Sequence, residues 1–364
     1  MTGPVAPQHG LSAGNSAAFN PASRLLVIAP HPDDETIAAA GLLQAARAAG
    51  ARVGVWLLTD GENNPWPQRW AERRWRIDAA ARCRWGARRR AESVAALQRL
   101  GLEPAAVLRA FGWPDGGITE RFITDPAGLV ALLAAELAAF APTDLVVPAA
   151  TDSHPDHGMA GILALLAARQ AGLAARILSY RVHGGQVPPS ALVCQLGADH
   201  WAAKQQAVAA FATQSVLTGP RLRHMAGRHE AFLPDLFWPW RGRTPAWRLQ
   251  TGSGGRILVG DLGWPSPALG RQRLIVVAAP AGGGPPAVQV VAGPALAARA
   301  RHRAGAIQLT VPGVAPENWQ LFVKLEPVRR SLWIFDRYPW HRLPAQAQMD
   351  TAGIPGRQTR DPSQ

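Results

Sequence analysis

From Arg24 onward, short apolar runs alternate along the chain with longer stretches of helical spacing. A short apolar run bounded by turn residues is typical of a buried strand, and a longer periodic stretch is typical of a helix. The alternation predicts strands at 25–29, 52–59, 106–111, 144–148 and 176–182, and helices at 36–49, 86–100, 126–140, 158–171 and 198–212. Such alternation indicates an α/β fold, a Rossmann-like, mostly parallel sheet with helices on both faces.

The pattern changes after about Thr251. Short β-favouring runs follow at 256–262, 273–279, 287–292, 306–311, 319–325 and 331–336, with Gly/Pro punctuation between them. Six short strands with turn signals predict a small antiparallel sandwich or barrel. Between the two patterns, residues 214–245 are expected to be irregular and to wrap around the first domain.

These patterns predict a domain division. We expect a flexible tail at 1–23, an α/β domain at 24–250, a β-rich accessory domain at 251–344 and a second tail at 345–364. The accessory domain is expected to contribute no metal ligand and to serve substrate docking or assembly. Its Trp319, Trp333 and Trp340 are candidate contacts, with filling of a sandwich core as the alternative.

A polar cluster follows the first predicted strand directly. The run Leu25–Ala29 leads into Pro30-His31-Pro32-Asp33-Asp34-Glu35, and a helical stretch begins at once. This turn lies at the carboxyl edge of the predicted sheet, where open α/β folds bind ligands. His31 and Asp34 are three apart at a helix start and can face one point, as two zinc ligands would. Asp33 would point elsewhere and is free to act as a base.

A second cluster repeats this arrangement after the strand at 144–148. The turn Thr151-Asp152-Ser153-His154-Pro155-Asp156-His157 precedes an Ala/Leu-rich helix. Two such edges of one sheet can converge on a single metal, with two histidines and one carboxylate as ligands and one position open for water. Helix capping is the alternative role for His31 and Asp34, and the pair of similar clusters favours the metal.

At these residues the chain resembles the zinc-dependent N-acetylglucosaminyl-deacetylase family known as PIG-L or LmbE-like. The resemblance rests on His31-Pro32-Asp33-Asp34-Glu35 together with His154-Pro155-Asp156-His157. Weaker family features are Thr59–Glu62, Arg89–Glu92, Trp113–Gly116 and the stretch from Lys204 to Gln214. It covers roughly residues 24 to 235, and the paired motifs are specific where either alone is not.

The resemblance implies a mechanism as well as a fold. His31, Asp34 and His157 would bind one Zn²⁺ per chain, with another divalent transition metal as an alternative. Asp33 would draw the proton from the metal-bound water as it attacks the acyl carbonyl. His154 would stabilise the oxyanion or protonate the leaving amine, with an ordinary supporting histidine as its alternative role.

Further residues are weaker candidates for binding substrate or supporting the centre. Asp156 is expected to orient an imidazole, because zinc-bound histidines usually donate their second nitrogen to a carboxylate or carbonyl. Glu35 is assigned to capping and support. Structural roles are expected for Asp60, Asp115 and Arg89, and His183 could face the pocket from a strand end.

Composition adds few constraints. The sequence has a formal net charge of +13 and only two cysteines, Cys83 and Cys194, which predicts reduced thiols rather than a disulfide framework. No apolar run approaches the ~20 residues of a membrane span, and residues 1–23 do not resemble a secretory signal. A cytoplasmic enzyme is expected, and oligomerisation stays open.

Positive charge gathers in an insertion after the second predicted strand. Residues 65–90 hold nine arginines against Glu72 and Asp78, together with Trp66, Trp70, Trp75 and Trp85. Arginine suits phosphate or carboxylate, and tryptophan suits sugar faces or a lipid interface. The alternative is a solvated helical face with its tryptophans packed on the core.

Together these features favour a hydrolase that removes the N-acetyl or another N-acyl group from an amino-sugar conjugate, which can be anionic. One alternative is an amidase acting on a non-sugar conjugate. Another is a non-catalytic, basic protein that binds glycans or nucleic acid, since arginine with aromatic platforms suits single strands. No specific nucleic acid is expected, because every residue needed for metal-assisted hydrolysis is present.

Overall fold

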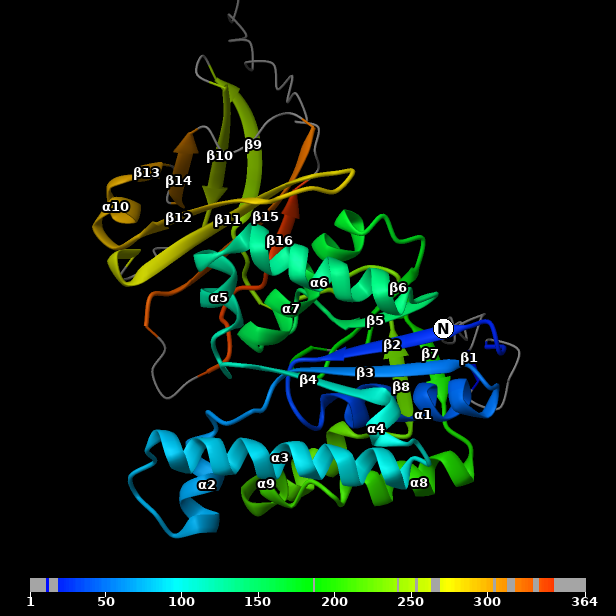
Figure 1. The fold of residues 1–364 in the computed structure, drawn as a ribbon. Helices are drawn as coiled ribbons and strands as arrows, with labels where there is room; N and C mark the ends of the chain where they lie inside the picture. Colours follow the sequence, from blue (N-terminus) through cyan, green and yellow to red (C-terminus); the bar gives the residue numbers. More distant parts are fainter. Residues whose placement is uncertain are drawn as a thin grey trace, which may run out of the picture.

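The structure is a computed structural model that describes residues 11–12, 19–185, 187–240, 242–252, 255–262, 269–303, 306–312, 318–329 and 334–343. Figure 1 shows an α/β part with a β sandwich lying over one of its helical layers. The expected tail at 345–364 and most of 1–23 lie outside the described residues. Within 1–23, the short strand β1 (Leu11–Ser12) pairs in parallel with β7 (Leu192–Gln195), and Phe19 is buried.

The central sheet has five parallel strands in the order β4-β3-β2-β5-β6. They are β2 (Arg24–Ala29), β3 (Arg52–Thr59), β4 (Leu108–Trp113), β5 (Asp144–Pro148) and β6 (Arg176–Tyr180). Successive strands are added on one side from β2 to β4 and on the other side from β5. This reversal leaves a crevice at the carboxyl ends of β2 and β5, where folds of this type bind ligands.

Helices cover both faces of this sheet, which confirms the predicted fold class. On one face lie α1 (Asp34–Ala48), α3 (Ala79–Arg99), α8 (Ala198–Val208) and α9 (Ala212–Met225). On the other lie α5 (Ile118–Thr124), α6 (Pro126–Phe140) and α7 (Pro155–Gln170). Successive residues of β2 point to opposite faces of the sheet. Leu25 and Val27 pack against the layer of α1, α3 and α8, and Leu26 and Ile28 pack against the layer of α5, α6 and α7.

No single helix in the described ranges is long and apolar enough to cross a membrane. The helices α5 and α6 reach that length and composition only as a pair, which is bent by 111°.

The predicted elements depart from the structure at several places. The first helix of the insertion, α2 (Pro65–Glu72), was not predicted. The run at 106–111 divides between the short α4 (Pro104–Val107) and β4. The expectation of an irregular 214–245 is wrong in part. There α9 continues to Met225 through Pro220, and β8 (His229–Phe232) pairs with β7 (Leu192–Gln195). Packing of α9 against α2, α3 and α8 overrides the helix-breaking residues.

The C-terminal part is an antiparallel sandwich, as predicted. One sheet has the order β13-β14-β10-β9 and the other β12-β11-β15-β16. The strands are β9 (Ala246–Gly252), β10 (Gly255–Asp261), β11 (Gln272–Pro280), β12 (Ala287–Ala292), β13 (Ala300–Arg303), β14 (Ala306–Pro312), β15 (Trp319–Pro327) and β16 (His341–Leu343), with a short helix α10 (Gly293–Ala298). Of the strand predicted at 331–336, residues 331–333 lie outside the described ranges and 334–336 form no strand.

Strand β11 faces two different cores. Leu274, Val276 and Ala278 point into the sandwich, whereas Ile275 and Val277 belong to the cluster built by α6 and α7. Polar contacts join the same two parts. Arg169 of α7 donates to Gln320 at 2.6 Å, and Arg273 contacts Glu120 of α5 at 2.5 Å. The sandwich therefore packs directly on the α5–α7 layer, while the domain division at 250/251 stays a prediction.

A buried ion pair ties α1 to α8 and β8. The ammonium of Lys204 lies 2.8 Å from Glu230 and donates to the carbonyl of Ile37, also at 2.8 Å. Glu230 in turn accepts from the backbone N–H groups of Gly41 and Leu42 at 2.8 and 3.1 Å. The pair thus inserts into the hydrogen-bond ladder of α1, and both of its side chains are fully shielded from solvent.

We expect Lys204→Met to destabilise the protein by about 3–5 kcal/mol, because it leaves the Glu230 carboxylate buried without its countercharge. Urea unfolding followed by circular dichroism measures the change. The double variant Lys204→Met/Glu230→Gln removes that charge and should recover part of the loss. Equal destabilisation of the single and double variants would show that packing, and not charge, dominates at this position.

Candidate metal centre

The loop after β2 brings three acidic residues to the start of α1. Asp33 is the residue before the helix and has φ of 117°, a backbone conformation that few non-glycine residues adopt. Its carbonyl accepts the first helical N–H groups, from Thr36 and Ile37, and its own N–H donates to Glu35 at 3.1 Å. The strained turn is therefore held by the helix that it begins, and it separates the directions of the Asp33 and Asp34 side chains.

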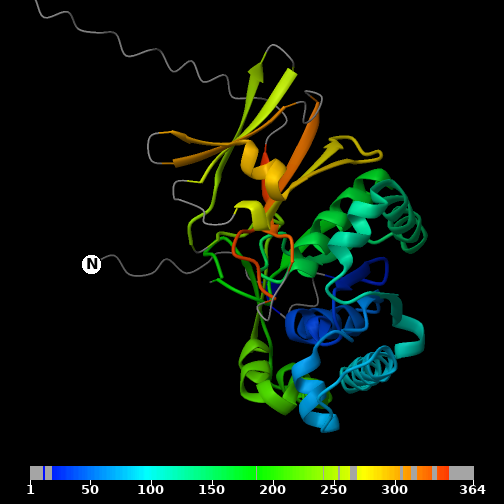
Figure 2. The same cartoon turned by 90° about the vertical axis from the view of Figure 1, so that its left-hand side faces the viewer.

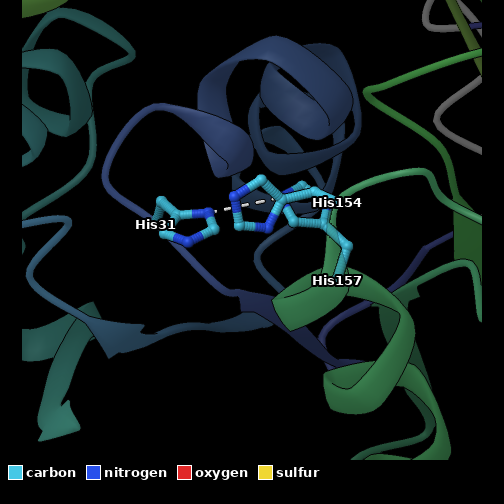
Figure 3. Close-up of side chains that lie close together, drawn as sticks. All are labelled: His31, His154 and His157. Atoms are coloured by element: carbon cyan, nitrogen blue, oxygen red, sulfur yellow. Dashed lines mark hydrogen bonds between the residues drawn. The ribbon is translucent and has the colours of Figure 1, made fainter. Parts of the chain in front are cut away.

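Three donor atoms from the two predicted clusters converge. Asp34 Oδ2 lies 3.3 Å from His31 Nδ1 and 3.1 Å from His157 Nε2, and the two imidazole nitrogens are 3.3 Å apart. Figure 3 shows the last of these contacts as a dashed line between the two rings. Ligand atoms of a tetrahedral zinc ion with bonds of about 2.0–2.1 Å are roughly 3.3 Å apart, so this donor set fits the ion.

The outer nitrogens of both imidazoles face carboxylates. His31 Nε2 lies 3.1 Å from Asp115 and 3.5 Å from Asp156, and His157 Nδ1 lies 3.3 Å from Asp152. Neither nitrogen has the alignment of a good hydrogen bond, so we treat these contacts as electrostatic. Carboxylates in this position orient metal-binding imidazoles and raise their basicity.

The carboxylates around His31 and His157 favour the protonated, positively charged form of both imidazoles. Burial lowers the pKa of His31, but Asp115, with Asp156 and Asp34, outweighs burial and raises the pKa well above its usual value. For His157, burial is likewise outweighed by Asp34 and Asp152, and its pKa rises to about 10. A buried site that favours protonated histidine also favours a metal cation.

Asp33 lies beside the donor atoms, against a buried arginine. Burial, opposed by the charge of Arg89 and reinforced by Asp34, raises the pKa of Asp33 to about 7. Arg89 donates to the carbonyls of Pro32 and Gly61 at 2.8 and 2.7 Å, and lies 3.4 Å from Asp33. Arg89 therefore fixes the loops after β2 and β3 relative to each other. Burial, with the charge of Asp33, also raises the pKa of Glu35 to about 8.

His154 is the N-cap of α7. Its Nδ1 accepts the backbone N–H of Asp156 at 3.3 Å, so Nε2 carries the proton of the neutral ring. Burial, reinforced by the charges of His31 and His157, lowers the pKa of His154 well below its usual value. Its ring stands edge-on to His31, with centroids 4.5 Å apart (Figure 3). His154 is thus a neutral hydrogen-bond donor next to the three donor atoms.

Of the remaining predicted residues, His183 and Asp156 lie at the histidine cluster, whereas Asp60 pairs with an arginine. His183 joins the cluster, with its ring 5.0 Å from His157, and burial lowers its pKa to about 4. Asp156 also accepts from the N–H groups of Gly116 and Ile118, which fixes the loop that carries Asp115. Asp60 turns away and pairs with Arg90 at 2.8 Å.

Sequence reasoning gave no role to Asp152. Its side chain accepts from the backbone N–H groups of His154, Val182 and His183 at 2.9 Å each and also faces His157. Asp152 therefore joins the loop after β5 to the end of β6. The sequence feature that could have indicated this role is the position of Asp152 in the second polar turn, two residues before His154. Its hydrogen bond with Val182 depends on tertiary structure and has no local sequence signal.

Several alternative donor sets overlap the same space. In the described residues, His154 with His31 and His157, His183 with Asp34 and His157, and Asp115 with Asp156 and His31 also bring donor atoms within 4.8 Å of one another. His154 is the weaker ligand because its Nδ1 already accepts a backbone N–H. The set of His31 Nδ1, Asp34 Oδ2 and His157 Nε2, which lie 3.1–3.3 Å from one another, stays the predicted ligand set.

The family model described as PIG-L, GlcNAc-PI de-N-acetylase, matches residues 26–168. This segment resembles the PIG-L family. It contains both polar turns and all of His31, Asp34 and His157.

A 1D-myo-inositol 2-acetamido-2-deoxy-alpha-D-glucopyranoside deacetylase of Mycolicibacterium gilvum is 35% identical over 146 residues, which are 37% of this chain and 50% of that protein. The match thus spans about half the length of the curated relative. Among solved structures, the conserved protein TT1542 of Thermus thermophilus is 27% identical with a TM-score of 0.44, covering 60% of this chain and 99% of that one. N,N'-diacetylchitobiose deacetylase of Pyrococcus horikoshii is 22% identical with a TM-score of 0.44, covering 60% and 86%.

We expect His157→Ala to lower the metal content of the purified protein, because it removes one of three converging donors and leaves Asp34 and Asp152 facing each other's charge. Elemental analysis after dialysis against metal-free buffer measures the loss. His229→Ala, at an exposed position on β8, is the matched control and should keep its metal. A full metal content in His157→Ala would contradict the ligand assignment.

Proposed function

We propose that this protein is a metal-dependent hydrolase that removes the N-acetyl group, or another N-acyl group, from an amino-sugar conjugate. The observation that carries the proposal is the convergence of His31 Nδ1, Asp34 Oδ2 and His157 Nε2 at 3.1–3.3 Å, with Asp33 and His154 beside them. A bound divalent ion, most plainly zinc, would act there as a Lewis acid and lower the pKa of water from about 15.7 toward about 7.

Asp33 supplies the base in this proposal. It holds its carboxylate beside the donor atoms without being one of them, and Arg89 fixes the backbone on either side of it. A buried carboxyl group with a pKa of about 7 is a stronger base than an ordinary aspartate. Asp33 would take the proton from the attacking water and later pass it toward the leaving nitrogen.

His154 supplies a hydrogen-bond donor. Because Nδ1 is occupied by the N–H of Asp156, the proton on Nε2 is available to an oxygen that develops negative charge. Its lowered pKa keeps the ring neutral, so it donates without adding a positive charge to the centre. His154 therefore differs from His157, whose pKa is raised because Asp34 and Asp152 lie next to it.

The amino-sugar class of the substrate is part of the proposal. It is supported by the description of the matching family and by the name of the Mycolicibacterium gilvum relative, both of which specify acetamido sugars. The arginines of 65–90 are compatible with an anionic conjugate. The cytoplasmic location expected from the sequence stays a prediction.

We expect Asp33→Asn to keep its metal while kcat for acetate release from an N-acetylglucosaminide falls by roughly two orders of magnitude or more, because the amide cannot accept the proton. The measurement pairs elemental analysis with an assay for the free amine. Asp60→Asn, which alters a carboxylate paired with Arg90, is the control and should retain activity. Loss of metal in Asp33→Asn would mean that the roles of Asp33 and Asp34 are exchanged.

A further inference from the structure

Residues 334–340, which precede β16, reach the metal centre from the sandwich. Figure 2, seen from the side of the strand carboxyl ends, shows this red segment between the sandwich and the loops of the α/β part. The ring of Phe335 lies 6.2 Å from His154, edge-on at 82°, and 5.3 Å from His183. The backbone N–H of Asp336 donates to the carbonyl of Ser153 at 2.7 Å, beside His154.

Buried contacts hold this segment in place. Asp336 pairs with Lys324 of β15 at 2.5 Å, and both side chains are buried. Trp340 is 1% exposed and packs on α7 at Gly158, where an added Cβ would lie 2.9 Å from the indole. The position of Phe335 is therefore fixed on both sides, by an ion pair to the sandwich and by packing on the helix that carries His157.

Phe335 differs in chemistry from its surroundings. Within the described residues, the rings next to His154 are those of His31, His157, His183 and Phe335. The first three are polar imidazoles, whereas the phenyl ring of Phe335 is apolar. An N-acyl group combines a polar carbonyl with an apolar chain. A carbonyl oxygen bonded to His154 would place that chain near the phenyl ring, which offers it an apolar contact.

We propose that Phe335 is a specificity-determining residue that limits the length of the acyl group, and that the sandwich thereby shapes the active site. This inference rests on the proposed function. Removing the ring opens space beside His154 without touching the donor atoms, so longer acyl chains should be accepted. A difference of one or two methylene groups in such a pocket changes selectivity by about 10–200-fold.

The test compares N-acetyl with N-butyryl glucosaminides for the native protein and Phe335→Ala. The kcat/KM ratio of butyryl to acetyl substrate should rise at least about tenfold in the variant, with unchanged metal content. Phe335→Tyr should keep the native preference, and Ile334→Ala, at an exposed neighbouring position, is the control. An unchanged ratio in Phe335→Ala would overturn the proposal.

A second readout separates this inference from the proposed function. Acetate and butyrate binding to the zinc-loaded protein can be compared by saturation-transfer NMR without any turnover. Phe335→Ala should improve butyrate binding relative to acetate at least about tenfold. A native protein that releases no acetate would contradict the proposed function, whereas an unchanged carboxylate preference would contradict the role of Phe335.

An independent observation concerns the insertion at 65–90. Trp85 is buried, but Trp66, Trp70 and Trp75 are 45%, 68% and 75% exposed. The guanidinium of Arg69 lies 4.8 and 5.1 Å from the rings of Trp66 and Trp75, which meet edge-to-face at 6.4 Å. Trp66 and Trp75 are thus held with Arg69 in a defined cluster, and Trp70 is exposed on the same helix as Trp66.

This cluster stands on a fixed base and carries positive charge. Gln68 is buried and donates to the carbonyl of Ala81 at 2.7 Å, which ties α2 to α3. Next to the tryptophans, Arg73, Arg74 and Arg76 are exposed. Helix α9, which packs against α2, also exposes Leu217. Exposed tryptophan beside arginine suits the interface of an anionic lipid bilayer, where indole rings lie at headgroup level.

We infer that the surface of Trp66, Trp70, Trp75, Arg73, Arg74 and Arg76 docks on anionic membranes. The aliphatic Leu217 on the adjoining helix favours a bilayer over a nucleic acid, since stacking on bases uses aromatic and charged groups. Figure 1 shows α2 on the same side as the carboxyl ends of the strands, because the loop from β3 leads directly into it. A membrane bound there would lie beside the edge of the sheet that carries the metal centre.

Cosedimentation with vesicles tests this surface without any assay of activity. The native protein should bind vesicles of phosphatidylcholine mixed with phosphatidylglycerol, less so with added salt, and more weakly vesicles of phosphatidylcholine alone. The triple variants Trp66→Ser/Trp70→Ser/Trp75→Ser and Arg73→Gln/Arg74→Gln/Arg76→Gln should each bind at least about tenfold more weakly.

Leu132→Ser, which alters an exposed apolar residue on α6, is the matched control and should bind as the native protein does. Equal binding by the native protein and the triple variants would overturn the inference, as would no binding at all. Displacement from vesicles by oligo(dT) at lower concentration than by free phosphatidylglycerol micelles would instead identify a nucleic-acid surface.

Discussion

The structure depends on the accumulation of carboxylates in a buried crevice. Asp33, Asp34, Asp115 and Asp152 gather at the ends of β2, β4 and β5, where desolvation penalises each negative charge. Asp156 lies among them, 3.5 Å from His31. At Asp34, Asp115 and Asp152 burial opposes ionisation, but neighbouring imidazoles outweigh it and the pKa of each carboxyl group is lowered. His157 and His31 act on Asp34, His31 acts on Asp115, and His157 and His183 act on Asp152. Compensating positive charge stabilises these carboxylates, and backbone N–H groups, imidazoles and the guanidinium of Arg89 provide it together.

This requirement explains why the loops are so closely tied to one another. Asp152 and Asp156 each accept from backbone groups of a neighbouring loop, so each carboxylate positions an imidazole and orders a turn. Arg89 does the same from α3, by donating to the carbonyls of Pro32 and Gly61. The scaffold and the chemistry of the site are thus built from the same hydrogen bonds, and changing one of these residues would affect both.

Local sequence patterns predicted those helices and strands whose bounds are set by their own residues and by the turns beside them. The strands at 52–59 and 144–148 and the helix at 126–140 have the predicted bounds, because apolar period and flanking turn residues agree there. The polar turns around His31 and His157 were visible for the same reason. His31 Nδ1, Asp34 Oδ2 and His157 Nε2 lie 3.1–3.3 Å from one another, and their role as metal ligands stays a prediction.

Other features follow from contacts that no local pattern contains. Helix α9 passes through Pro220 because it packs on three other helices. The strand predicted at 273–279 was assigned to a sandwich, but the second face of β11 is also apolar, through Ile275 and Val277, because α6 and α7 cover it. Phe335 is more than 150 residues from His183, so sequence offered no signal for their contact.

The shared core between the sandwich and α6–α7 has a consequence for synthesis of the chain. Ile275, Val277, Phe322 and Trp340 cover an apolar surface whose other half, on α6 and α7, lies more than 100 residues earlier. On the ribosome, the α/β part emerges first, and this surface stays open to water until Trp340 has left the exit tunnel. The nascent protein therefore carries an uncovered hydrophobic layer through the last part of translation, a natural binding site for chaperones.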